Sequence, residues 1–122
     1  MVDVNEEIEA ALADLSCTAC YQYPADFNDL PVVSFYNLTE RPDFGSDNEE
    51  DIQMGWAQLD VWGDYPKDVG SLAIEVHKAM TAAGWTREFS MDVPSRTRME
   101  NNVEIRTDVF HRTMRYVKDF SI

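Results

Sequence analysis

The order of hydrophobic patterns constrains this chain most, because strand-like segments come in runs and do not alternate strictly with helical ones. Apolar residues recur at helical spacing in residues 4–15 and again between Pro66 and Gly84. Segments rich in β-branched and aromatic residues occupy residues 17–23, 32–38, 52–62, 85–93 and 108–120. The resulting order, α-β-β-β-α-β-β, predicts an α+β fold with an antiparallel or mixed sheet of about five strands and two helices packed on one face.

Both expected helices are bounded by residues that are typical of helix ends. Asp3 and Glu6 have the spacing of a capping box at the start of the first helix, whose stripe is Val4, Ile8, Ala11, Leu12 and Leu15. Pro66 suits the first turn of the second helix, and Gly84 suits the position where a helix stops. The stripe between them consists of Val69, Leu72, Ala73, Val76, Met80 and Ala83.

A chain of 122 residues has the size of one domain, so we expect residues 1–122 to share one core. Residues 39–51 carry six acids, one Pro and one Gly, which predicts an acidic surface loop. This loop lacks the ligand spacing of a calcium-binding loop. Residues 94–107 are polar and basic, which fits either a loop or a protruding hairpin.

The formal charge of −13 disfavours specific nucleic-acid binding, which needs many Lys and Arg side chains. The charge is unevenly distributed: residues 1–86 hold 17 acids and 3 bases, whereas residues 87–122 hold 6 acids and 7 bases. Surfaces of opposite sign on one subunit suit head-to-tail self-association, although the same charge can serve solubility alone. No apolar run reaches the length of a membrane-spanning helix, so no membrane partner is expected.

The sequence contains no motif that points to an enzyme, so we expect no catalytic residue, no cofactor and no metal. The chain has no phosphate-binding glycine loop, no nucleophile elbow and no zinc-protease motif. Cys17 and Cys20 lack zinc-site partners at the usual spacing, so we interpret them as ordinary reduced thiols. His77 fits a packed structural histidine, and His111 lacks a nucleophile and an orienting group in the sequence around it.

Between residues 21 and 118 the chain resembles tail-terminator proteins of long-tailed bacteriophages, also called tail-completion or head-tail joining proteins. The resemblance lies in the order and character of the segments. They are Leu30-Pro31 before an aromatic strand, the strand end Asp60-Val61-Trp62, Gly84-Trp85-Thr86-Arg87 after the second helix, and the ending from His111-Arg112 to Arg115-Tyr116. None of these segments is a catalytic signature.

The resemblance implies a structural protein of the virion tail, assembled in the bacterial host cytoplasm. Such a subunit forms a ring with copies of itself, typically a hexamer, on the end of the tail tube. The ring ends polymerisation of the tube protein and offers a surface to the head-tail connector protein. An acidic wall would let DNA pass through such a ring without sticking. Candidate interface residues are Asp47, Glu49, Glu50, Asp51, Arg96, Arg98, Arg106, Arg112 and Arg115.

A monomeric acidic binding protein is the alternative, for example a DNA mimic that inhibits a host nucleic-acid-binding protein. It accounts equally well for the charge of −13. It accounts poorly for the seven bases among residues 87–122, from which a mimic gains nothing.

Overall fold

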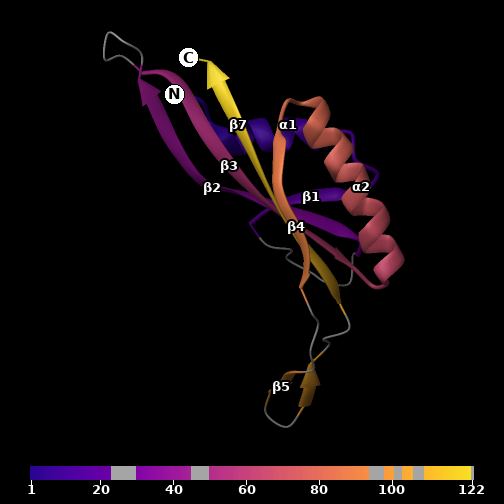
Figure 1. The fold of residues 1–122 in the computed structure, drawn as a ribbon. Helices are drawn as coiled ribbons and strands as arrows, with labels where there is room; N and C mark the ends of the chain where they lie inside the picture. The colour runs from indigo at the N-terminus through magenta and orange to yellow at the C-terminus, as the bar shows by residue number, and fades with distance from the viewer. Residues whose placement is uncertain (23–29, 45–49, 94–97, 101–102, 106–108, 122) are drawn as a thin grey trace.

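The computed structural model describes residues 1–22, 30–44, 50–93, 98–100, 103–105 and 109–121. Its helices are α1 (Val4–Ala11) and α2 (Pro66–Ala82). Its strands are β1 (Thr18–Tyr21), β2 (Val32–Phe44), β3 (Glu50–Gly63), β4 (Thr86–Val93), β5 (Arg98–Glu100), β6 (Val103–Ile105) and β7 (Phe110–Ser121). Figure 1 shows the long strands β2, β3 and β7 running beside one another, with α2 along one side of them.

Five strands form the main sheet in the order β1-β2-β3-β7-β4. β1 and β2 are parallel, and the other neighbours are antiparallel. The mixed α+β sheet and the order of its strands and helices confirm the fold expected from the hydrophobic patterns. No helix in the described part of the chain is long and apolar enough to cross a membrane.

Both helices pack on the same face of the sheet. In β3 the odd-numbered residues Ala57, Leu59 and Val61 face the core, where they meet Ile8 of α1 and Val76 of α2, all fully buried. The alternation of side chains along a strand sends the even-numbered residues of β3 to the opposite face. The sheet therefore has one face covered by helices and one face that neither helix covers.

The expected helix ends are confirmed in part. The carboxylate of Asp3 accepts a hydrogen bond from the backbone N–H of Glu6 at 3.4 Å, which caps α1. α1 ends at Ala11 and does not continue to Leu15, which packs against the core from beyond the helix. α2 begins at Pro66, and Gly84 follows it with φ of +91°, a conformation that favours glycine.

The loop expected at residues 39–51 is wrong in its bounds. β2 continues to Phe44 and β3 starts at Glu50, with Arg41 opposite Met54 in the antiparallel register. Charged side chains and Pro42 are loop signals in the sequence, but a strand at a sheet edge tolerates both. The Arg41 guanidinium lies 5.8 Å from the ring centroid of Trp56 and donates to Met54 Sδ at 3.3 Å, so side-chain contacts support the strand extension.

The basic segment at 94–107 contains the short strands β5 and β6, which pair antiparallel with Arg98 opposite Ile105. In Figure 1 this small sheet lies beyond the end of the five-stranded sheet. The two ends of the chain lie at the end of the main sheet that is farthest from β5 and β6. There the backbone of Val2 is hydrogen-bonded to the Gln53 side chain, and Ser121 of β7 pairs with Ile52 of β3.

Candidate interaction surfaces

The described structure covers only part of the expected interface set. Asp47, Glu49, Arg96 and Arg106 lie outside the described residues. Glu50 and Asp51 lie at the start of β3, and Arg98 lies in β5, where only the backbone is described. Arg112 and Arg115 are the two whose side chains can be located.

Arg112 and Arg115 fall on opposite faces of β7, because residues three apart in a strand point to opposite sides. On the helix-covered face, Arg112 donates from Nε to Ser90 Oγ at 2.7 Å and from Nη1 to Asp92 Oδ1 at 3.1 Å. On the other face, the Arg115 guanidinium carbon lies 4.7 Å from the Phe89 ring centroid. The two arginines therefore do not form one patch.

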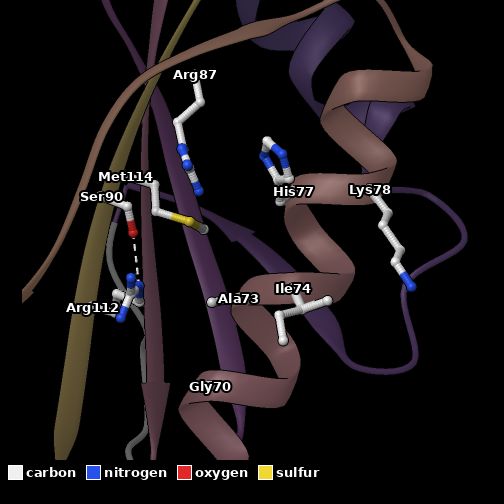
Figure 2. Close-up of a pocket in the computed structure, with 9 residues that line it drawn as sticks. All are labelled: Gly70, Ala73, Ile74, His77, Lys78, Arg87, Ser90, Arg112 and Met114. Atoms are coloured by element: carbon white, nitrogen blue, oxygen red, sulfur yellow. Dashed lines mark hydrogen bonds between the residues drawn. The ribbon is translucent and has the colours of Figure 1, made fainter.

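A groove runs between α2 and the strands β4 and β7, with a volume of about 300 Å³. Figure 2 shows Arg87 and Arg112 entering it from the strands and His77 facing them from α2. Its lining residues are Gly70, Ala73, Ile74, His77, Lys78, Arg87, Ser90, Arg112 and Met114. Among the described residues, the lining thus holds three Lys or Arg side chains and no acidic one, in a chain whose net charge is −13.

We call this groove the basic groove. Its basic side chains differ in whether they form hydrogen bonds or ion pairs. Arg112 is paired with Asp92, as described above. Among the described residues, neither Arg87 nor Lys78 has a hydrogen bond or an ion pair, and Figure 2 shows the Lys78 ammonium extending away along the outer side of α2. The side chain of Ile74, at the helix side of the groove, is 60% exposed. The groove therefore presents positive charge beside apolar surface.

A buried tyrosine underlies the groove. The Tyr116 hydroxyl is hydrogen-bonded to Nδ1 of His77 at 2.9 Å and lies 3.9 Å from Met114 Sδ. Burial raises the pKa of Tyr116 to about 12, and the nearby positive charge of Arg87 opposes that rise. The hydrogen bond fits the structural role expected for His77.

The opposite face of the sheet carries an aromatic and polar cluster around His111. Its ring stacks on Trp62, with centroids 3.7 Å apart and an interplanar angle of 11°. Nε2 of His111 lies 2.7 Å from Oδ1 of Asp60, and Trp62 donates to Ser34 Oγ at 3.0 Å. Asp60 thus supplies an orienting group for His111 that the sequence did not reveal.

His111 also borders a cavity of about 480 Å³ at the start of α2. Its other lining residues are Pro66, Val69, Gly70, Asp92, Val93, Phe110 and Arg112. A histidine held by a carboxylate can act as a base, but activation of a nucleophile also needs a hydroxyl, thiol or amine beside it. None of these described lining residues carries such a group, so the pair supports no mechanism of that kind there.

The two cysteines are free thiols. Burial raises the pKa of both, and the negative charge of Glu75 raises that of Cys17 further. Raised pKa values keep both thiols protonated and weakly reactive near neutral pH. Over the described residues, no cluster of three or more His, Cys, Asp or Glu side chains is placed to hold a metal ion.

The basic groove could not be predicted from the sequence, because its cations come from segments far apart in the chain. A weak signal exists on α2, where Gly70, Ile74 and Lys78 recur every four residues and so share one helix face. An exposed Ile and a Lys on that face, outside the core stripe, are compatible with a contact surface. Only the pairing of β4 with β7 brings Arg87 and Arg112 to the same place.

Comparison with known proteins supports the fold. No protein family model and no curated protein sequence matches the chain. Among solved structures, the fold is similar to that of a chain in the virion of a native gene transfer agent (GTA) particle, with a TM-score of 0.53 and 12% sequence identity. The match covers 98% of this chain and 92% of that chain, so it extends over the whole α+β domain.

Proposed function

We propose that this protein is a structural virion protein that acts as a tail terminator. In this role it forms an oligomeric ring on the end of the tail tube, ends tube polymerisation and joins the tail to the head. The observation that carries the proposal is the fold similarity to a virion chain over 98% of the present chain. The segment order that resembles phage tail terminators points to the same role.

The distribution of charge supports assembly from identical subunits. A closed ring is built from a heterologous contact, in which two different patches of one subunit meet in neighbouring copies. The basic groove offers a positively charged patch. The rest of the chain has an excess of acidic residues and so offers negatively charged surface that complements it. A monomeric DNA mimic would have no use for Arg87 in such a groove or for Lys78 beside it.

The partners in this proposal are other copies of the chain, the tail tube protein and the head-tail connector protein. The net charge of −13 suits a ring through which DNA passes, because a negative wall repels phosphates. The proposed location is the virion tail, after assembly in the bacterial cytoplasm. This role needs no catalytic step and no cofactor.

Electron microscopy of particles assembled without this protein tests the role. We expect tail tubes of irregular and excessive length that fail to join heads, and normal tails when the gene is supplied in trans. Tubes of normal length joined to heads in its absence would contradict the terminator role. Association of the purified protein with a host nuclease or repressor, with no effect on tails, would favour the acidic inhibitor instead.

A further inference from the structure

We infer that the basic groove between α2, β4 and β7 receives the exposed face of helix α1 from a second copy of this chain. This face, which we call the acidic helix face, lies opposite the stripe of α1 that is buried in the core. It consists of Glu6, Glu9 and Ala10 of α1 and Ala13 of the turn that follows, all exposed. The inference rests on the proposed function, because it specifies the contact between neighbouring subunits of the ring.

The charge of the acidic helix face complements that of the groove. The carboxylates of Glu6 and Glu9 have no hydrogen bond or ion pair in the described structure, and the sequence has no Lys or Arg before Arg41. Arg87 enters the groove from β4 and likewise has no hydrogen bond or ion pair among the described residues, and Lys78 lies beside the groove (Figure 2). Opposite charges brought together in this way favour association and fix its orientation.

The groove is long enough to hold α1. It continues toward the start of α2 as the cavity that His111 borders, because Gly70 and Arg112 line both. The space beside Gly70 is open, since an added Cβ there would meet no atom within 4 Å. The lining residues extend along α2 from Pro66 to Lys78, which at about 1.5 Å per residue is roughly 18 Å. α1 has 8 residues and is therefore about 12 Å long.

Apolar surface is present on both sides of this contact. The Ile74 side chain is 60% exposed at the groove, and Ala73 and Met114 lie in its lining. On the acidic helix face, the small side chains of Ala10 and Ala13 are exposed, which lets another surface approach the helix closely. Apolar contact of this kind supplies affinity, and the charges around it supply specificity.

The groove and α1 of one subunit lie on opposite sides of α2. Ser16, just beyond α1, donates from its backbone N–H and its hydroxyl to the Glu75 carboxylate at 2.6 and 2.8 Å. Residues two apart in a helix point in nearly opposite directions, so His77, which lines the groove, faces away from that contact. α2 therefore separates the acidic helix face from the groove of the same subunit, and a contact between them requires two copies.

The two surfaces lie at the same level along the strands. The side-chain oxygen of Asn5 in α1 accepts a hydrogen bond from the backbone N–H of Asn37 at 2.7 Å, and Asn37 pairs with Ala57. Ala57 pairs in turn with Tyr116, and Tyr116 pairs with Arg87 at the groove. Surfaces at one level can meet through a rotation about an axis along the strands with little shift along it. Such a head-to-tail contact can close into a ring, whereas a contact with a large shift builds a helical filament.

Charge reversal with rescue tests the inference in the full chain. The groove variant is Lys78→Glu with Arg87→Glu, and the helix variant is Glu6→Lys with Glu9→Lys. We expect each variant alone to self-associate more than about tenfold more weakly than the wild type, because like charges then face each other. In an equimolar mixture the two variants should alternate: the reversed helix face meets the reversed groove, and the two unaltered surfaces meet each other. The mixture should therefore associate like the wild type.

The measurement is sedimentation velocity at low ionic strength, where charge pairs are weakly screened. Arg41→Glu and Asp119→Lys are the controls, because both exposed residues lie opposite Met54 on the face of the sheet that neither helix covers. Both controls should associate like the wild type. Glu6→Gln with Glu9→Gln removes the charge with residues that favour a helix, and it should weaken association about threefold.

The inference is overturned by a wild type that stays monomeric at the highest soluble concentration, or by reversed variants that associate like the wild type. A mixture that does not recover, although circular dichroism shows both variants to be folded, overturns it as well. If the reversed helix variant does not fold, the glutamine variant decides, and unchanged association of that variant counts against the contact. Loss of binding to tail tubes or DNA in the groove variant, with self-association intact, would assign the groove to another partner. The terminator role is tested separately, by the length of tails assembled without the protein.

Discussion

The imidazole of His111 lies flat against the indole of Trp62, with the ring centroids 3.7 Å apart, while its Nε2 lies 2.7 Å from the Asp60 carboxylate. The two aromatic residues are opposite each other on β7 and β3, so the stack joins the central strands of the sheet. The side chains of His111 and Asp60 are only 19% and 14% exposed. The cluster therefore stabilises the face of the sheet that neither helix covers.

Removal of this histidine should destabilise the fold. We expect His111→Ala to lower the free energy of unfolding by about 2 kcal/mol, because it removes the stack and leaves the Asp60 carboxylate without this partner. Urea denaturation followed by Trp fluorescence measures the change. Lys67→Ala, at an exposed position of α2, is the control and should change the stability little. An unchanged midpoint for His111→Ala would contradict the structural role.

Close packing of α1 on β3 depends on Gly55. A Cβ at this position would lie 3.0 Å from Val4 Cγ2 and 3.2 Å from Phe120 Cε2. We expect Gly55→Ala to destabilise the protein by about 1–3 kcal/mol, because the packed Val4 and Phe120 side chains must shift to make room for the added methyl group. Gly70→Ala is the matched control: nothing lies within 4 Å of its added Cβ, and alanine favours a helix interior by about 1 kcal/mol. Opposite shifts in melting temperature for the two variants would support this packing, and equal shifts would contradict it.

Alkaline pH should destabilise the fold through Tyr116. Its pKa is about 12 in the folded protein and about 10 in an unfolded chain. Because the folded value is the higher one, the contribution is fully present below about pH 10 and is lost as the pH rises toward 12. The loss amounts to about 2–3 kcal/mol, at roughly 1.36 kcal/mol per pKa unit.

Tyr116→Phe isolates this contribution from the other groups that titrate at alkaline pH. The variant also loses the hydrogen bond to His77, so its stability at neutral pH should be lower. Its stability should fall less steeply than that of the wild type between about pH 10 and pH 12. Denaturation curves with the same slope against pH for both proteins would show that Tyr116 does not titrate as described.

Both cysteines should react slowly with thiol reagents at neutral pH. Burial raises the pKa of Cys17 and Cys20, so the reactive thiolate is scarce. The reaction rate of the native protein should rise as the pH increases and should become much faster on unfolding. Rapid labelling of the folded protein at neutral pH would contradict half-buried, protonated thiols at these two positions.

The periodicity of apolar residues predicted the helices and strands well, because each of them buries one face in the core. The stripe from Val69 to Met80 packs in the core as expected, and Pro66 and Gly84 bracket the helix. The ends of β2 and β3 were missed because their stability comes from pairing across the hairpin, including Arg41 over Trp56, which local composition does not reveal.

The basic groove and the contact between Asp60 and His111 were missed for a related reason. Asp60 and His111 lie on β3 and β7, and Arg87 and Arg112 lie on β4 and β7, so each pair meets only through strand register. A single sequence carries the composition of these strands but not the register that aligns them.

Labelling of intact virions with antibody against this protein tests the central claim most directly. If the protein forms a ring on the end of the tail tube, electron microscopy should show label at the single junction of head and tail on each particle. Label along the tail, label over the capsid or particles that carry no label would contradict the account.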